Sequence, residues 1–170
     1  MAGTIEVLDE GKLLAFSIEE MLRYSGPGSP GGVAQGFKIL ERALPLLDPA
    51  QPPQRRQISV RTAFAGPGAR DAIELVTRAA TGDRYTVDPA LALAQRGSTL
   101  EQFVFRIGYR DAAVTLAVRE GIVTDEFVTL ARTDGRSSTQ EERLDRLKLE
   151  MFDLVMGLAA AEVYDVVEAA

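Results

Sequence analysis

The sequence predicts an α+β fold in which a mostly antiparallel sheet packs against three long helices. Three segments repeat apolar residues at helical spacing, and several shorter segments alternate apolar and polar residues as strands do. Helices and strands do not alternate regularly, as they would around a parallel sheet. The chain has 170 residues, the length of one compact domain, and we expect a single domain over residues 1–170.

The N-terminal elements are a short strand at residues 4–7 and a helix over residues 13–24. The start of this helix is open between two positions. Ser17 is an alternative N-cap, because Glu20 follows it by three residues as in a capping box.

A second helix is expected over residues 32–47, where apolar residues at helical spacing form one buried stripe. Pro45 should end or kink this helix, because proline has no amide hydrogen. Residues 57–64 come next and indicate a strand, since one face carries Ile58, Val60, Thr62 and Phe64.

A third helix is expected over residues 69–80, with Pro67 suited to its first turn. Residues 84–87 indicate a short strand, whereas residues 89–96 fit no single pattern. Two further alternating segments, 102–109 and 113–119, indicate a hairpin.

The C-terminal part begins with a short helical segment within residues 122–131. Thr139 and Glu142 have the form of a capping box and open a strongly amphipathic helix. Residues 163–167 are expected to close the fold as a last strand.

The chain contains neither cysteine nor histidine, which excludes several chemistries. Thiol nucleophiles, histidine bases, disulfides, iron–sulfur clusters and ordinary zinc sites all need one of these residues. We therefore expect no metal and no cofactor.

The net charge and hydropathy of the chain limit the binding partners and the cellular location that we expect. The net charge is −6 and no basic stripe is present, so nucleic acid and anionic membrane are not expected partners. No apolar run approaches the roughly 20 residues of a membrane span. The N-terminus also lacks the pattern of a secretory signal, so we expect a cytoplasmic protein.

Two glycine-rich segments, residues 24–37 (YSGPGSPGGVAQGF) and 65–72 (AGPGARDA), each precede or open a helix. The first matches G-x-G-x-x-G, but it follows a helical pattern and its prolines lack amide donors, which argues against dinucleotide binding. One interpretation is that free amides at both helix starts bind an anion. The alternative is that the glycines form tight turns where two elements pack closely.

The first glycine-rich segment resembles the formylmethanofuran dehydrogenase E-subunit family in its residues 24–31 (YSGPGSPG) and 36–38 (GFK). That family carries an aromatic residue, then His-Gly-His-x-Cys-Pro-Gly, then a helix beginning near Gly-Tyr-Arg. Residues 68–80 are similar to its second block, Cys-x-x-Asp-Ala-Ile-Gln-x-x-Thr-Gly-Cys-Thr, with Asp71-Ala72-Ile73 as the shared core. The resemblance covers most of the chain, including a following hairpin, helix and strand.

The chain departs from this family at the residues suited to metal or redox chemistry. Ser25, Pro27 and Ser29 stand where the family has His, His and Cys, and Gly68 and Ala79 stand where its second block has cysteines. The family's C-terminal cysteine-rich metal module has no counterpart in the sequence. The resemblance therefore implies a surviving pocket between two glycine loops, with Arg70 and Asp71 at its floor, but no metal.

These observations predict a metal-free protein that binds a small, anionic ligand or serves as an accessory module. The resemblance adds a link to one-carbon or pterin metabolism. The alternatives are an enzyme with Asp71 as acid/base and loop amides as oxyanion hole, or a purely structural subunit. Asp71 also has a simpler role, since a carboxylate is favoured in a first helical turn.

The wide apolar face of the final helix predicts a homodimer. The ligand-binding residues that we expect all belong to the two glycine-rich segments or adjoin them. They are Tyr24, Ser25, Gly26, Ser29, Gly31, Gly32, Thr62, Gly68, Arg70 and Asp71.

Overall fold

A five-stranded sheet forms one layer of the protein, in a computed structural model that describes residues 3–168. The strand order is β4-β3-β5-β6-β7, and every pair is antiparallel except β3–β4. This confirms the predicted α+β class and the mostly antiparallel sheet. The strands are β3 (Ile58–Thr62), β4 (Tyr85–Val87), β5 (Val104–Tyr109), β6 (Ala112–Val118) and β7 (Tyr164–Val167).

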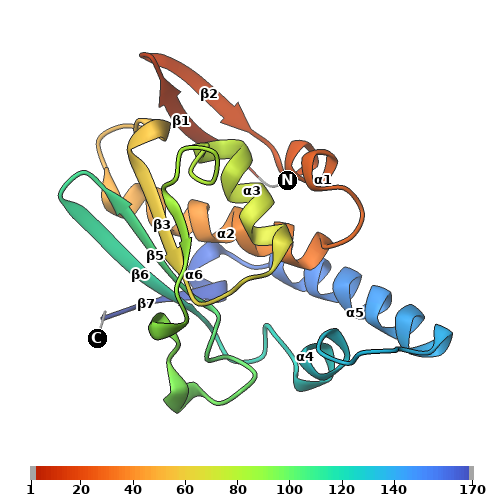
Figure 1. The fold of residues 1–170 in the computed structure, drawn as a ribbon. Coiled ribbons are helices and arrows are strands. Elements are labelled where there is room, and N and C mark those ends of the chain that lie inside the picture. The colour runs from red at the N-terminus through yellow and green to blue at the C-terminus, as the bar shows by residue number, and fades with distance from the viewer. Residues whose placement is uncertain (1–2, 169–170) are drawn as a thin grey trace.

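The helices form a second layer on one face of this sheet (Figure 1). The long helix α2 lies at the centre of this layer and packs against α3, α5 and the sheet. The helices are α1 (Ile18–Ser25), α2 (Pro30–Leu47), α3 (Pro67–Thr77), α4 (Asp125–Ala131), α5 (Ser138–Met156) and α6 (Ala160–Val163). Short 3₁₀ turns occupy η1 (Arg55–Gln57), η2 (Pro89–Leu91) and η3 (Ala94–Arg96).

A separate hairpin of β1 (Ile5–Asp9) and β2 (Lys12–Phe16) stands beside α1 and α3 (Figure 1). The prediction of one helix over residues 13–24 was therefore wrong in its first part. Glu10 and Gly11 both have positive φ, a turn that matches the twist of a two-residue hairpin, so the chain folds back on β1. The helix begins after Ser17, where the predicted capping box with Glu20 is present.

Other helix boundaries also differ from the predictions, and both α2 and α3 begin two residues earlier than expected, at Pro30 and Pro67. The third helix ends at Thr77 rather than at residue 80, because Arg78 takes a left-handed φ of 56° and Glu74 accepts hydrogen bonds from the amides that follow. The capping box of α5 is formed by Ser137 and Gln140, two residues before the predicted pair.

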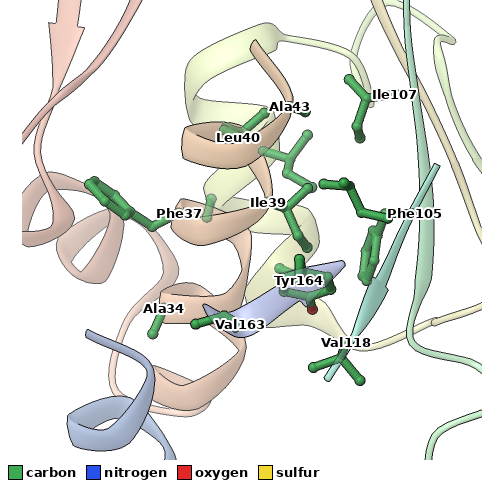
Figure 2. Close-up of a cluster of buried hydrophobic side chains, with 14 of the residues drawn as sticks. Ala34, Phe37, Ile39, Leu40, Ala43, Phe105, Ile107, Val118, Val163 and Tyr164 are labelled. Atoms are coloured by element: carbon green, nitrogen blue, oxygen red, sulfur yellow. The ribbon is translucent and has the colours of Figure 1, made fainter. Parts of the chain in front are cut away.

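The core lies between α2 and the sheet (Figure 2). Ile39 points toward Phe105 and Ile107 of β5, whereas Phe37 points away from the sheet. Both Ile39 and Phe37 are fully buried, because α2 is covered by helices on the side that does not face the sheet. Pro45 lies in the last turn of α2, which ends at Leu47.

Candidate functional site

The starts of α2 and α3 touch each other through glycines. A Cβ atom at Gly32 would lie 3.2 Å from Gly68 Cα, and one at Gly68 would lie 2.7 Å from the Ser29 carbonyl oxygen. Only glycine allows the two backbones to approach this closely. The structure thus confirms the simpler interpretation of these glycines, that they permit close packing.

A cavity of about 300 Å³ opens beside this contact, and we call it the helix-start cavity. It is lined by residues from α2 and its N-cap, α3, α4 and α5, and from the segments before α3 and before β5. They are Ser29, Gly31, Gly32, Gln35, Phe64, Gly66, Pro67, Gly68, Phe103, Phe127, Ala131, Lys148 and Met151. Four other hollows of the described residues are each more open to solvent.

Both helix starts at the cavity lack a side-chain cap. In α2 the N-cap residue Ser29 makes no capping hydrogen bond, and in α3 the N-cap residue is Gly66. The first helical residue is proline in both, and the first-turn residues that follow it, Gly31, Gly32 and Gly68, line the cavity. First-turn amides have no partner within the helix and carry a partial positive charge.

Lys148 of α5 also lines this cavity, and its side chain carries a positive charge. Its side chain is about one-quarter exposed, and its ammonium lies 3.9 Å from a carboxylate oxygen of Asp145, a long ion pair. A positive side chain beside two helix N-termini makes this region attractive to an anion.

Gln35 places a buried amide at the cavity wall. Its side chain is 2% exposed, and its Oε1 accepts a hydrogen bond of 2.6 Å from the Tyr164 hydroxyl. Burial raises the pKa of Tyr164 well above its ordinary value, so the phenol keeps the proton that it donates. Gln35 Nε2 donates to the Met151 sulfur at 3.1 Å, a weak acceptor, and the same nitrogen carries a second N–H donor.

Aromatic side chains form the apolar part of the cavity. The rings of Phe64 and Phe103 are stacked, with centroids 4.4 Å apart, and Phe105 meets Phe64 edge-on at 6.3 Å. Gly66 lets the Phe64 ring fold over its own loop, since a Cβ there would lie 2.2 Å from that ring. Phe127 of α4 adds a third ring to the lining.

Four of the ten predicted ligand-binding residues line this cavity, namely Ser29, Gly31, Gly32 and Gly68. The other six lie outside its lining. Among them, Thr62 is fully buried, with its hydroxyl donating to the Val104 carbonyl at 2.7 Å and accepting from the Phe64 amide. Thr62 therefore holds the strand end that leads into the second glycine-rich segment.

Asp71 and Arg70 do not form the floor of the cavity. Asp71 accepts a hydrogen bond of 2.9 Å from the Ser25 hydroxyl and thereby ties the end of α1 to α3. The Arg70 side chain is half exposed. Tyr24 is 53% exposed, and Gly26 is the C-cap of α1 with φ of 82°.

Sequence reasoning missed the residues that complete the cavity: Gln35, Phe64, Gly66, Pro67, Phe103, Phe127, Ala131, Lys148 and Met151. Gln35 offered no signal, because it lies off the apolar stripe that helical spacing predicts for residues 32–47. Lys148 offered none, since nothing in its surroundings distinguishes it from the other charged residues of α5.

Comparison with known proteins adds no assignment. The chain matches no protein-family model and no curated protein. Across residues 3–168, no group of three or more carboxylates is placed to hold a metal ion. In the same part of the chain, no helix combines the length and apolar character needed to cross a membrane.

Proposed function

We propose that the helix-start cavity binds a small organic anion and that the chain acts as a ligand-binding or accessory protein. The observation that carries this proposal is the convergence of two uncapped helix starts and Lys148 on one cavity. A carboxylate or phosphate at this point would accept hydrogen bonds from first-turn amides of α2 and α3.

The local charge matters because the whole protein does not attract anions. The net charge is −6, so long-range steering would oppose an anionic ligand. Selectivity must come from contacts within the cavity, where each helix N-terminus contributes about 0.3–1 kcal/mol toward a bound charge. Lys148 adds a direct charge–charge attraction.

Binding is favoured over catalysis by the position of Asp71. An acid/base mechanism with Asp71 and an amide oxyanion hole needs both groups within reach of one reacting atom. Asp71 instead bonds to Ser25, and it lies outside the lining that contains the amides of Gly31 and Gly68. Kinship to the formylmethanofuran dehydrogenase E-subunit family, the metabolic link, the homodimer and the cytoplasmic location stay predictions.

The proposal is tested by titrating the ¹⁵N-labelled full chain with 2-naphthoate and with the neutral alcohol 2-naphthalenemethanol. The amide signals of Gly31, Gly32 and Gly68 should shift with the carboxylate at concentrations where the alcohol has no effect. Native mass spectrometry of the purified protein would in parallel detect any copurified ligand.

A pair of lysine variants tests whether the positive charge of Lys148 contributes to binding of the anion. Lys148→Gln should weaken naphthoate binding about fivefold, the equivalent of about 1 kcal/mol. Lys12→Gln is the matched control, because Lys12 is exposed on β2 and outside the cavity. Equal binding of the acid and the alcohol, or an equal effect of the two variants, would contradict the proposal.

A further inference from the structure

We infer that the ligand of the helix-start cavity has a flat aromatic body to which the acid group is attached. This inference rests on the proposed function and adds the chemical class of the ligand. It follows from the arrangement of the aromatic side chains, which is independent of the charges discussed above.

The aromatic wall is held rigidly in place. Phe103 is 3% exposed and stacks on Phe64, and Phe64 in turn meets Phe105, a fully buried residue of β5. Phe105 meets the Tyr164 ring edge-on at 6.0 Å, and Figure 2 shows these two residues facing each other in the core. The Phe64 and Phe103 rings that line the cavity are thus the end of an aromatic cluster anchored in the core.

A rigid wall of rings selects flat ligands. Aromatic pairs prefer offset stacking or edge-to-face contacts at centroid distances of about 4.5–7 Å, and these geometries add to the effect of buried area. The Met151 sulfur, which also lines the cavity, makes favourable contacts with aromatic rings. Most of the remaining lining is glycine, proline and alanine, whose small side chains leave room for a ring.

Gln35 supplies the polar group that would orient such a ligand. The Tyr164 hydroxyl fixes its carbonyl end, so the amide nitrogen keeps one direction. Its second N–H is suited to a carbonyl or ring heteroatom on the aromatic body. The cavity therefore offers separate positions for an acid group, a ring and an acceptor on that ring.

The test compares 2-naphthoate with its saturated counterpart, decahydronaphthalene-2-carboxylate, on the full chain. Both are carboxylates of similar size, and the saturated acid is the more hydrophobic. We expect 2-naphthoate to bind about 2- to 12-fold more tightly. The chain has no tryptophan, so naphthoate fluorescence is measured with little background, and the Gly31, Gly32 and Gly68 amides report the saturated acid.

Phe103→Leu should reduce this preference to about one, because leucine fills much of the volume without a ring. Phe152→Leu is the control, since Phe152 packs against the core from α5 but does not line the cavity. If Phe103→Leu does not fold, Phe127→Leu replaces it, because Phe127 is only partly buried on α4. A preference that survives both lining variants would overturn the inference.

The outcomes separate this inference from the proposed function. Equal affinity for the two acids overturns the aromatic class and leaves the anion site intact. Tight binding of 2-naphthalenemethanol would overturn the anion site and leave the aromatic preference intact. If none of the probes shifts the three glycine amides, both the inference and the proposed function are wrong.

Discussion

The contact between the starts of α2 and α3 predicts a large effect for Gly68→Ala. The new Cβ would lie 2.7 Å from the Ser29 carbonyl oxygen, and 2.9 Å from both the Ser29 Cβ and the Val33 amide nitrogen. Two of these three atoms belong to the backbone of α2 and its N-cap. Relief of the clash therefore requires the two helices to move apart, and a change of side-chain rotamer cannot provide it.

The magnitude follows from the cost of overpacking. Adding one carbon to a close-packed interface typically costs about 1–3 kcal/mol. Alanine is favoured over glycine in helices by at most about 1 kcal/mol, which offsets part of this cost at Gly68 in the first turn. We expect a net loss of about 1–2 kcal/mol in the free energy of unfolding, which lowers the melting temperature by about 2–8 °C for a chain of this size.

The assay is urea unfolding followed by circular dichroism, with Gly28→Ala as the control. Gly28 lies in the loop before α2, next to the Ser29 that Gly68 contacts; a Cβ added to Gly28 would have no atom within 4 Å, and Gly28 is not among the glycines with positive φ. This variant should change the free energy of unfolding by less than about 0.5 kcal/mol. Equal midpoints for the two variants would refute the close contact between the helix starts.

Three further predictions concern buried polar groups. Tyr164→Phe removes the buried hydroxyl that donates to Gln35 Oε1, and it should lower the free energy of unfolding in urea by about 1–3 kcal/mol. An unchanged free energy of unfolding would contradict this hydrogen bond. Burial raises the pKa of Glu74, but hydrogen bonds from Thr81 and Ala80 outweigh it, so the folded pKa lies below the ordinary value. The contribution of Glu74 to stability is therefore present above about pH 4.3 and is lost as the pH falls through the folded pKa. Glu74→Gln should make the free energy of unfolding depend less on pH, measured from about pH 5 to about pH 2.5. Burial also raises the pKa of Tyr85 to about 12, and the stability linked to this shift is complete below about pH 10 and is lost as the pH rises toward 12. Tyr85→Phe should therefore reduce the loss of stability at alkaline pH. This variant should not lower stability at about pH 8, because the Tyr85 hydroxyl is buried without a partner among the described residues.

Local patterns predicted most of the secondary structure and failed where a turn competed with a helix. Residues 12–16 (KLLAF) are good helix formers, and only the pairing with β1 makes them a strand. A strand was predicted over residues 57–64 because alternation reflects a sheet with one buried face, which is the situation of β3, although β3 ends at Thr62 and leaves Phe64 in the loop before α3. A periodic pattern reports which face is buried, but it does not report which neighbour covers it.

The residues of the candidate site were likewise predicted only in part. Ser29, Gly31, Gly32 and Gly68 were predicted because glycines before a helix are visible in the sequence. Phe103 belongs to the alternating segment 102–109 that predicted a strand, and its place at the cavity depends on the start of β5 lying beside the segment before α3, where Phe103 stacks on Phe64. That juxtaposition has no local signature.

The sequence by itself determined the α+β class, the absence of thiol and imidazole chemistry, and the positions of two helix starts rich in glycine. These follow from residue type and short-range spacing, which act within a few residues along the chain. Only the tertiary structure decided that the two helix starts touch, that the cavity opens beside them and not over Asp71, and that Lys148 and Gln35 line it. Those features depend on contacts between residues as far apart as Gln35 and Tyr164, and such contacts are set by the packing of whole helices on the sheet.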